Sequence, residues 1–176
     1  MINTAASGHP TTSGPATGWT GAGTRCALSA KAMTSRKRRM PTDRVLADFA
    51  GDWMIERTIS PKSGPVARFD GMARWAPSAQ GLDYTEQGTL HVEGASPMQA
   101  ERAYVWRPDL SVYFDDGRFF HKVPTQGGRT QHFCDPDTYS GAYDFSDWPQ
   151  FTVSWDVRGP RKDYRMISLF RRQAGS

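Results

Sequence analysis

The stretch FTVSWDVRGPRKDYRMISLFRR, residues 151–172, decides the fold class of this chain. Apolar and polar residues alternate on both sides of a Gly-Pro step, which is the pattern of two half-buried strands joined by a turn. A two-residue turn would set arginine against arginine and aspartate against aspartate across the hairpin, which is unfavourable. A four-residue turn, Gly-Pro-Arg-Lys, instead pairs Arg158 with Asp163 and Asp156 with Arg165. We therefore predict the longer turn.

The longer turn gathers the large apolar side chains of both strands on one inward face, with Arg161 and Lys162 at the tip. This face consists of Phe151, Val153, Trp155, Val157, Tyr164, Met166 and Phe170. An uninterrupted apolar face on a hairpin must be buried against further strands, because a lone hairpin is not stable in water.

Asp116-Gly117 marks a second hairpin, since Asp-Gly is a strong signal for a two-residue turn. This turn would pair Phe114 with Phe119, Tyr113 with Phe120 and Val112 with His121. One face of the hairpin would then be apolar around a single histidine: Leu110, Val112, Phe114, Phe119, His121 and Val123.

Ten short strands account for most of the chain, and turn residues separate them. The candidates are 52–60, 66–76, 81–92, 99–107, 110–115, 118–124, 129–135, 138–145, 150–158 and 163–172. One short helix, 42–50, precedes them, with Val45, Leu46 and Phe49 on one face. We predict an all-β fold, a single antiparallel up-and-down barrel of eight to ten strands, because no helical pattern alternates with the strands.

The positive charge of the chain is confined to its first forty residues. The formal net charge is +4, but residues 1–40 hold six basic and no acidic residues. Of the 22 basic residues, 16 remain beyond them against all 18 acidic residues, a net charge of −2. We predict a disordered basic extension over 1–41 and a barrel domain over 42–174.

Several functions fit the extension. It has the composition of a transit peptide but lacks the apolar core of a secretory signal, so we expect a cytoplasmic protein. Arg36–Arg39 would suit phosphate contact, whereas a start at Met33 or Met40 would remove most of the basic charge. Nucleic acid is therefore not the expected partner. No apolar run reaches about 18 residues, so we expect no membrane span.

The first and last predicted strands carry a resemblance to a known superfamily. Gly51-Asp52-Trp53 opens the first strand and Phe170-Arg171-Arg172 ends the last, and in this the chain resembles the calycins, the superfamily of lipocalins and fatty-acid-binding proteins. In lipocalins a basic residue of the last strand packs over the Trp of a Gly-x-Trp motif at the closed barrel end. The resemblance implies this role for Gly51, Trp53 and either Arg171 or Arg172.

Residues 115–121 and 159–164 are similar to a bacterial family known only as a domain of unknown function. This similarity covers nearly all of 45–172. It implies no activity.

Histidines supply the candidates for chemistry. His121 lies on an apolar face, where it would hold a ligand, bind haem iron, act as acid or base, or be a packed residue. His132 and Cys134 share one strand face, and we favour a packed histidine and a buried, inert thiol over a nucleophile or a zinc corner. Two cysteines exclude both a disulfide scaffold and a four-cysteine zinc site, and we expect no metal.

We expect the turn 159–162 at the open mouth of the barrel, and three polar residues lie at or beside it. Arg161, Lys162 and Tyr164 would hold the carboxylate or phosphate end of a ligand, and the resemblance to fatty-acid-binding proteins favours this role only loosely. Arg118 is a further candidate contact, although a cross-strand pair with Asp115 explains it equally well. Trp155 is a candidate aromatic contact or a packing residue.

We consider three functions. The first is the binding of a small hydrophobic or amphipathic ligand inside the barrel, which predicts a cavity of several hundred Å³. The second is a small enzyme with His121 or His132 as acid or base, assisted by Tyr139, Tyr143 or Tyr164, or a haem protein. The third is contact of the extension with nucleic acid. The oligomeric state and the identity of the ligand stay open.

Overall fold

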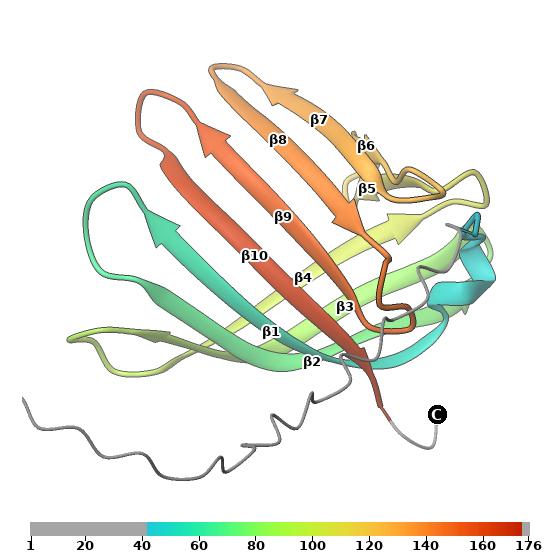
Figure 1. Ribbon diagram of the computed structural model, residues 1–176, viewed down its shortest axis with the longest axis horizontal. Coiled ribbons are helices and arrows are strands. Elements are labelled where there is room, and N and C mark those ends of the chain that lie inside the picture. The colour runs from blue at the N-terminus through green and yellow to red at the C-terminus, as the bar shows by residue number, and fades with distance from the viewer. Residues whose placement is uncertain (1–41, 174–176) are drawn as a thin grey trace, which may run out of the picture. The chain divides into compact units, whose positions relative to one another are not determined.

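The computed structural model describes residues 42–173, which form ten strands in one antiparallel sheet (Figure 1). The strands are β1 (Gly51–Pro61), β2 (Ala67–Ser78), β3 (Gly81–Val92), β4 (Met98–Trp106), β5 (Ser111–Phe114), β6 (Phe119–Lys122), β7 (Gly128–Cys134), β8 (Asp137–Asp144), β9 (Phe151–Arg158) and β10 (Asp163–Arg172). The prediction of an all-β up-and-down barrel is confirmed. The extension predicted over 1–41 lies outside the described residues.

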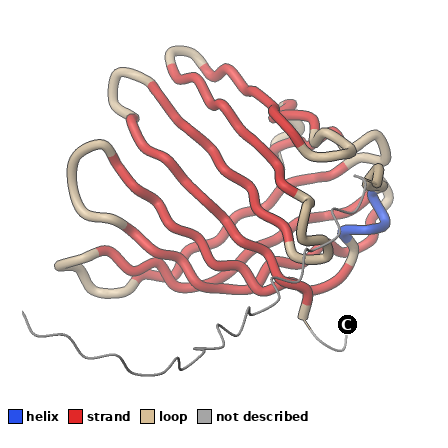
Figure 2. Tube along the Cα trace, viewed as in Figure 1, coloured by secondary structure: helices blue, strands red, loops and turns tan. Residues whose placement is uncertain are grey.

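The sheet curls into a nearly closed barrel whose strand order is β6-β5-β4-β3-β2-β1-β10-β9-β8-β7 (Figure 2). The first and last strands pair along their length, from Trp53 with Arg172 to Pro61 with Tyr164. The two edge strands, β6 and β7, share no backbone ladder within residues 42–173. We call the line between these two edges the β6–β7 seam.

The β9–β10 hairpin has the predicted register. Arg158 pairs with Asp163, Asp156 pairs with Arg165, and the Gly159 N–H donates to the Lys162 carbonyl at 2.7 Å. The four-residue turn therefore sets opposite charges against each other across the outer face. Six residues of the predicted inward face are buried, as expected, while the seventh, Tyr164, is half-buried.

The β5–β6 hairpin differs from the prediction. Val112 pairs with His121 as expected, but Tyr113 pairs with Phe119, because the register shifts by one residue at a β-bulge. The turn contains three residues rather than two and ends at Gly117, whose φ of 84° suits glycine. In consequence Phe120 packs against the cavity side, whereas Phe119 is 51% exposed, so its predicted inward position was wrong.

Aromatic rings fill one end of the barrel. They belong to Phe49, Trp53, Trp75, Trp106, Phe145, Trp148 and Phe151. The Arg172 guanidinium lies over Trp53, 4.5 Å from the ring centroid, and donates to the carbonyls of Asp48 and Ala50 at 2.6 and 3.1 Å. Arg171 lies elsewhere, where it contacts Glu56 and Gln150. Of the two arginines, Arg172 therefore closes this end.

The predicted helix is shorter than expected. Only η1 (Leu46–Phe49), a 3₁₀ turn, is helical within the range 42–50. Residues three apart share a side in this geometry, so Leu46 and Phe49 pack inward while Val45 is exposed, contrary to the prediction for that residue. Within the described residues, no helix has the length and apolar character to cross a membrane.

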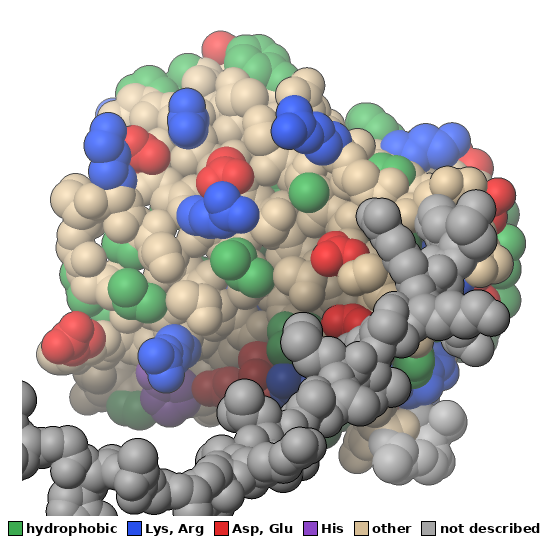
Figure 3. Space-filling model, in the orientation of Figure 1, with side chains coloured by type: hydrophobic (Ala, Val, Ile, Leu, Met, Phe, Trp, Pro, Cys, Tyr) green, Lys and Arg blue, Asp and Glu red, His purple; other side chains and the backbone are tan. Residues whose placement is uncertain are grey.

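Charges of both signs are interspersed on the outer face that Figure 3 shows. Pairs such as Arg165 with Asp156 and Lys62 with Asp163 lie on the outer surface of the sheet. This face offers no broad basic field for nucleic acid.

Candidate functional site

The barrel is not filled solid by its side chains, because it contains a cavity of about 270 Å³. The cavity wall is mostly aromatic, and its members include Trp75, Tyr104, Trp106, Phe114, Phe120 and Trp155. Polar side chains interrupt this wall, from β1, β3, β4, β6, β7, β8 and β10. Small-molecule sites have the same character: a concave apolar pocket with a few convergent polar groups.

His121 and Tyr143 form a polar pair on this wall, from β6 and β8. The His121 Nε2 lies 2.7 Å from the Tyr143 hydroxyl, within hydrogen-bond distance. Both side chains are buried, and Phe120 and Trp155 pack edge-on against the imidazole. The pair therefore sits in an apolar setting, where each group depends on the other for its hydrogen bond.

The second nitrogen of His121 has no partner. Its Nδ1 is buried without a hydrogen bond to any described residue. Burial, with a smaller effect of His132, lowers the pKa of His121 to about 3, so the ring is neutral at neutral pH. Burial also raises the pKa of Tyr143. The pair is thus a neutral hydrogen-bonding group.

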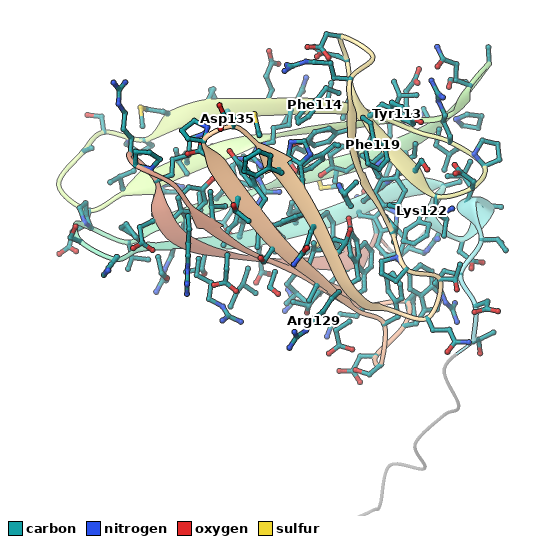
Figure 4. The ribbon with its side chains drawn as sticks, turned by 90° about the horizontal axis from the view of Figure 1, so that it is seen from above. Tyr113, Phe114, Phe119, Lys122, Arg129 and Asp135 are labelled. Carbon is teal, nitrogen blue, oxygen red and sulfur yellow. The ribbon has the colours of Figure 1, made fainter. Side chains whose placement is uncertain are left out.

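His132 closes the β6–β7 seam from the β7 side. Its ring lies 5.0 Å from the Phe120 ring and 5.8 Å from the Phe114 ring, and it forms a hydrogen bond with the Phe120 backbone. Burial lowers the pKa of His132, and the charge of Arg118 acts in the same direction. Its Nε2 is buried without a partner among the described residues. Figure 4 shows the seam from above, with Phe119 labelled on β6 and Arg129 and Asp135 at the two ends of β7.

Cys134 ends β7 and Tyr164 lies at the start of β10, so both lie at the end of the barrel opposite the aromatic end, which we call the mouth. Both line the cavity, and Tyr164 is half-buried. Cys134 is an exposed free thiol, so the expectation of a buried cysteine was wrong. The reason is its position at the last residue of edge strand β7, where no further strand covers it.

Arg57 and Glu86 form a buried ion pair that the sequence analysis did not identify. The two terminal guanidinium nitrogens of Arg57 donate to the two carboxylate oxygens of Glu86 at 2.5 and 2.7 Å. The Arg57 Nε donates to the Ser168 hydroxyl at 2.7 Å, and the Tyr84 hydroxyl donates to Glu86. We call these four residues the ion-pair network; it links β1, β3 and β10.

A close approach of two strands accompanies this network. Gly71 on β2 pairs directly with Gly88 on β3, and a Cβ on Gly71 would lie 2.3 Å from a backbone oxygen of β3. Both glycines lie on the inward side of their strands, so no side chain stands between Arg57 and Glu86 at these positions. This lets the pair form across the intervening strand β2.

The electrostatics of the network favour its charged form. Burial alone would lower the pKa of Arg57, but the hydrogen bond and charge of Glu86 raise it. Burial alone would raise the pKa of Glu86, but hydrogen bonds from Arg57 and Tyr84 and the charge of Arg102 hold it below its ordinary value. Burial raises the pKa of Tyr84, and the Glu86 charge adds to this effect.

The basic residues predicted for ligand contact lie outside the cavity lining. Lys162 is exposed and forms an ion pair with Asp137 at 2.7 Å and a hydrogen bond with Tyr139. Arg118 forms an ion pair with Asp116 at 2.7 Å, and Arg161 is an exposed turn residue. Side chains at the tip of a turn point to solvent. The three predicted cationic contacts therefore lie at the surface and not in the cavity wall.

Of the other candidates, the structure brings together His121 and Trp155 on the cavity wall, with His132 and Tyr164 beside them. The residues that sequence reasoning missed, Arg57 and Glu86, carried one signal. Each occupies an inward position of an alternating strand, where a charge is unexpected unless it is paired. No three His, Cys, Asp or Glu side chains within residues 42–173 are grouped so as to hold a metal ion.

A family model matches residues 49–172, and its description is a family of unknown function, DUF6314. The chain belongs to this family. No curated protein matches the chain. Among solved structures, it is similar to an S-type phycobiliprotein lyase from Guillardia theta, with a TM-score of 0.53 and 8% identity over 74% of this chain and 92% of that one. At this identity the similarity establishes the shared fold, an antiparallel β-barrel.

Proposed function

We propose that the barrel binds a small hydrophobic or amphipathic molecule in its cavity. One observation carries the proposal: an aromatic cavity of about 270 Å³ has a buried polar pair in its wall, and one nitrogen of that pair lacks a partner. An unpaired buried polar atom costs stability. A ligand that supplies the missing hydrogen bond would offset this cost.

The state of the polar pair favours binding over acid–base chemistry. With a pKa of about 3, His121 is a neutral imidazole near neutral pH, so it is neither an acid in its imidazolium form nor a strong enough base to take up a proton. Burial raises the pKa of Tyr143, so its phenol does not ionise either. Effective general acids and bases have pKa values near the working pH. The pair is better suited to orient a ligand through neutral hydrogen bonds.

The wider relationships support a binding role. Arg172 over Trp53 at the aromatic end is in keeping with a calycin-like barrel. The solved structure with the same fold is named a phycobiliprotein lyase, which favours a barrel that handles a small molecule. The exposed free thiol of Cys134 is in keeping with a reducing compartment such as the cytoplasm.

N-phenyl-1-naphthylamine, a neutral apolar fluorophore, tests the proposal. The fluorescence of this compound should rise when it binds to the purified chain. The bound compound should also quench the fluorescence of the tryptophans in the cavity wall. Cys134→Trp places a bulky ring at the mouth, and we expect it to weaken binding about tenfold. Phe133→Trp is the matched control, because Phe133 is the preceding residue of β7 and is 68% exposed on the outer side.

Equal binding by both variants and the wild type would place the fluorophore outside the cavity and contradict the proposal. Native mass spectrometry of protein from its own cells gives an independent measurement, since a co-purifying molecule would identify the ligand class. A haem absorbance band in the purified protein would instead support haem coordination by His121 or His132.

A further inference from the structure

Arg102 is the unbalanced charge of the cavity wall. Three ionised side chains line the cavity: Arg57, Glu86 and Arg102. Arg57 occupies both carboxylate oxygens of Glu86, and Tyr84 donates to one of them. Arg102 reaches Glu86 only at 3.6 Å, and its side chain is 40% exposed. Two cations against one anion leave the wall with a net charge of +1.

The surroundings of Arg102 suit an incoming anion. Tyr104 lies two residues after Arg102 on β4 and forms a hydrogen bond with it through the phenol hydroxyl. Burial, the larger effect, raises the pKa of Tyr164 on β10, while the charge of Arg102 acts to lower it. Both tyrosines line the cavity. A guanidinium with neighbouring phenols offers several donors to a carboxylate, phosphate or sulfonate group.

Arg102 also borders a second hollow, which carboxylates line. Glu101 and Asp115 share this hollow, of about 350 Å³, with Arg102 and Glu86. Among the described residues, Glu86 is the one carboxylate that forms an ion pair with Arg102. Glu101 and Asp115 do not line the cavity, so an anion that approaches Arg102 from the cavity side meets one carboxylate, Glu86, which Arg57 already pairs.

We propose that Arg102 recognises the anionic group of the ligand, so that the cavity takes amphipathic anions whose apolar body packs against Phe120 and Trp155. This inference rests on the proposed function and narrows it to one ligand class. It replaces the turn residues Arg161 and Lys162, which lie outside the cavity lining, with a residue of the wall itself.

Two fluorophores with the same aromatic skeleton test the inference. 8-Anilino-1-naphthalenesulfonate carries one sulfonate, and N-phenyl-1-naphthylamine lacks it. We expect Arg102→Gln to weaken binding of the sulfonate at least about tenfold and to leave the neutral fluorophore unchanged. Arg102→Lys keeps the charge and should retain part of the affinity, while Arg161→Gln removes an exposed charge and should change neither.

Raising the salt concentration should weaken the binding of the sulfonate and leave the binding of the neutral compound unchanged. Equal affinity of Arg102→Gln and the wild type for the sulfonate would overturn the inference and leave the proposed function intact. Loss of both fluorophores in Arg102→Gln would also overturn it, since Arg102 would then maintain the wall rather than recognise an anion. If neither compound binds the wild type, the proposed function fails and the anionic subsite fails with it.

Discussion

The hydrogen bond between His121 and Tyr143 places two polar groups in a wall that is otherwise aromatic. Removing one partner leaves the other buried and unsatisfied, at a cost of about 1–3 kcal/mol. We expect His121→Phe to lower the free energy of unfolding by about this amount. The double variant His121→Phe/Tyr143→Phe should recover most of the loss, because it removes both polar groups and keeps the rings. Urea denaturation measures both.

A double variant as stable as the wild type would mean that the pair is not required for stability, which strengthens a role in binding. A double variant that loses as much as the sum of the single changes would contradict the prediction. Tyr143→Phe alone completes the cycle and isolates the coupling between the two residues.

The low pKa of His121 makes the stability of the barrel depend on pH. The folded pKa of about 3 lies below the unfolded value of 6.5, so the unfolded chain binds a proton that the folded chain does not. Stability is therefore full above the unfolded pKa and falls with decreasing pH, by about 1.4 kcal/mol per pH unit at the steepest.

Urea midpoints between pH 7 and pH 5 measure this slope. In that window most carboxylates stay ionised, so the titration of histidine dominates. His121→Phe should show a shallower slope than the wild type, with His91→Gln as a control for an exposed histidine of β3. Equal slopes for all three proteins would contradict the prediction.

At the scale of strands, the ion-pair network connects segments that are distant in sequence. Glu86 accepts hydrogen bonds from β1 and from its own strand, and both Arg57 and Glu86 are buried. Breaking a buried pair leaves an uncompensated charge, which costs about 3–5 kcal/mol. We expect Glu86→Gln to destabilise the barrel by about this amount, measured by urea denaturation. Glu101→Gln, an exposed neighbour on β4, is the control and should stay within about 0.5 kcal/mol of the wild type.

The strands also show which features local sequence rules can predict. The β9–β10 register was predictable because opposite charges such as Arg158 and Asp163 lie close in sequence and leave one favourable alignment. The ion-pair network was not, since Arg57 and Glu86 are separated by 29 residues and meet across β2. No rule for neighbouring positions links two such residues.

The β5–β6 hairpin shows a second limit. The Asp-Gly signal predicts a hairpin correctly, but it does not count the residues in the turn. A bulge directs Phe120 to the cavity, where its ring stacks on Trp155 at 5.2 Å and faces His132 across the seam. These partners come from β9 and β7, so the advantage of the bulge depends on strands that the hairpin sequence does not contain.

At the scale of the molecule, the barrel depends on the contact between its first and last strands. Arg172 donates to two backbone carbonyls before β1 and covers Trp53, whereas Arg171 binds exposed Glu56 and Gln150. We expect Arg172→Ala to cost about 2 kcal/mol and Arg171→Ala less than about 1 kcal/mol. Thermal or urea unfolding of the two single variants compares them directly, and equal losses would contradict a special role for Arg172.

The β6–β7 seam has a consequence for how the chain is threaded. From one sheet edge to the other, the strand order runs β7 to β10 and then β1 to β6. The start of β1 and the end of β10 therefore lie in the middle of the sheet, and residues 123–127 connect β6 to β7 across the seam. A circular permutant that joins Gln173 to Thr42 by a flexible linker and begins at Gln126 would visit the strands in their spatial order. Every ladder would then join consecutive strands, which lowers the contact order. We expect this permutant to fold, and to refold faster than the parent in stopped-flow measurements.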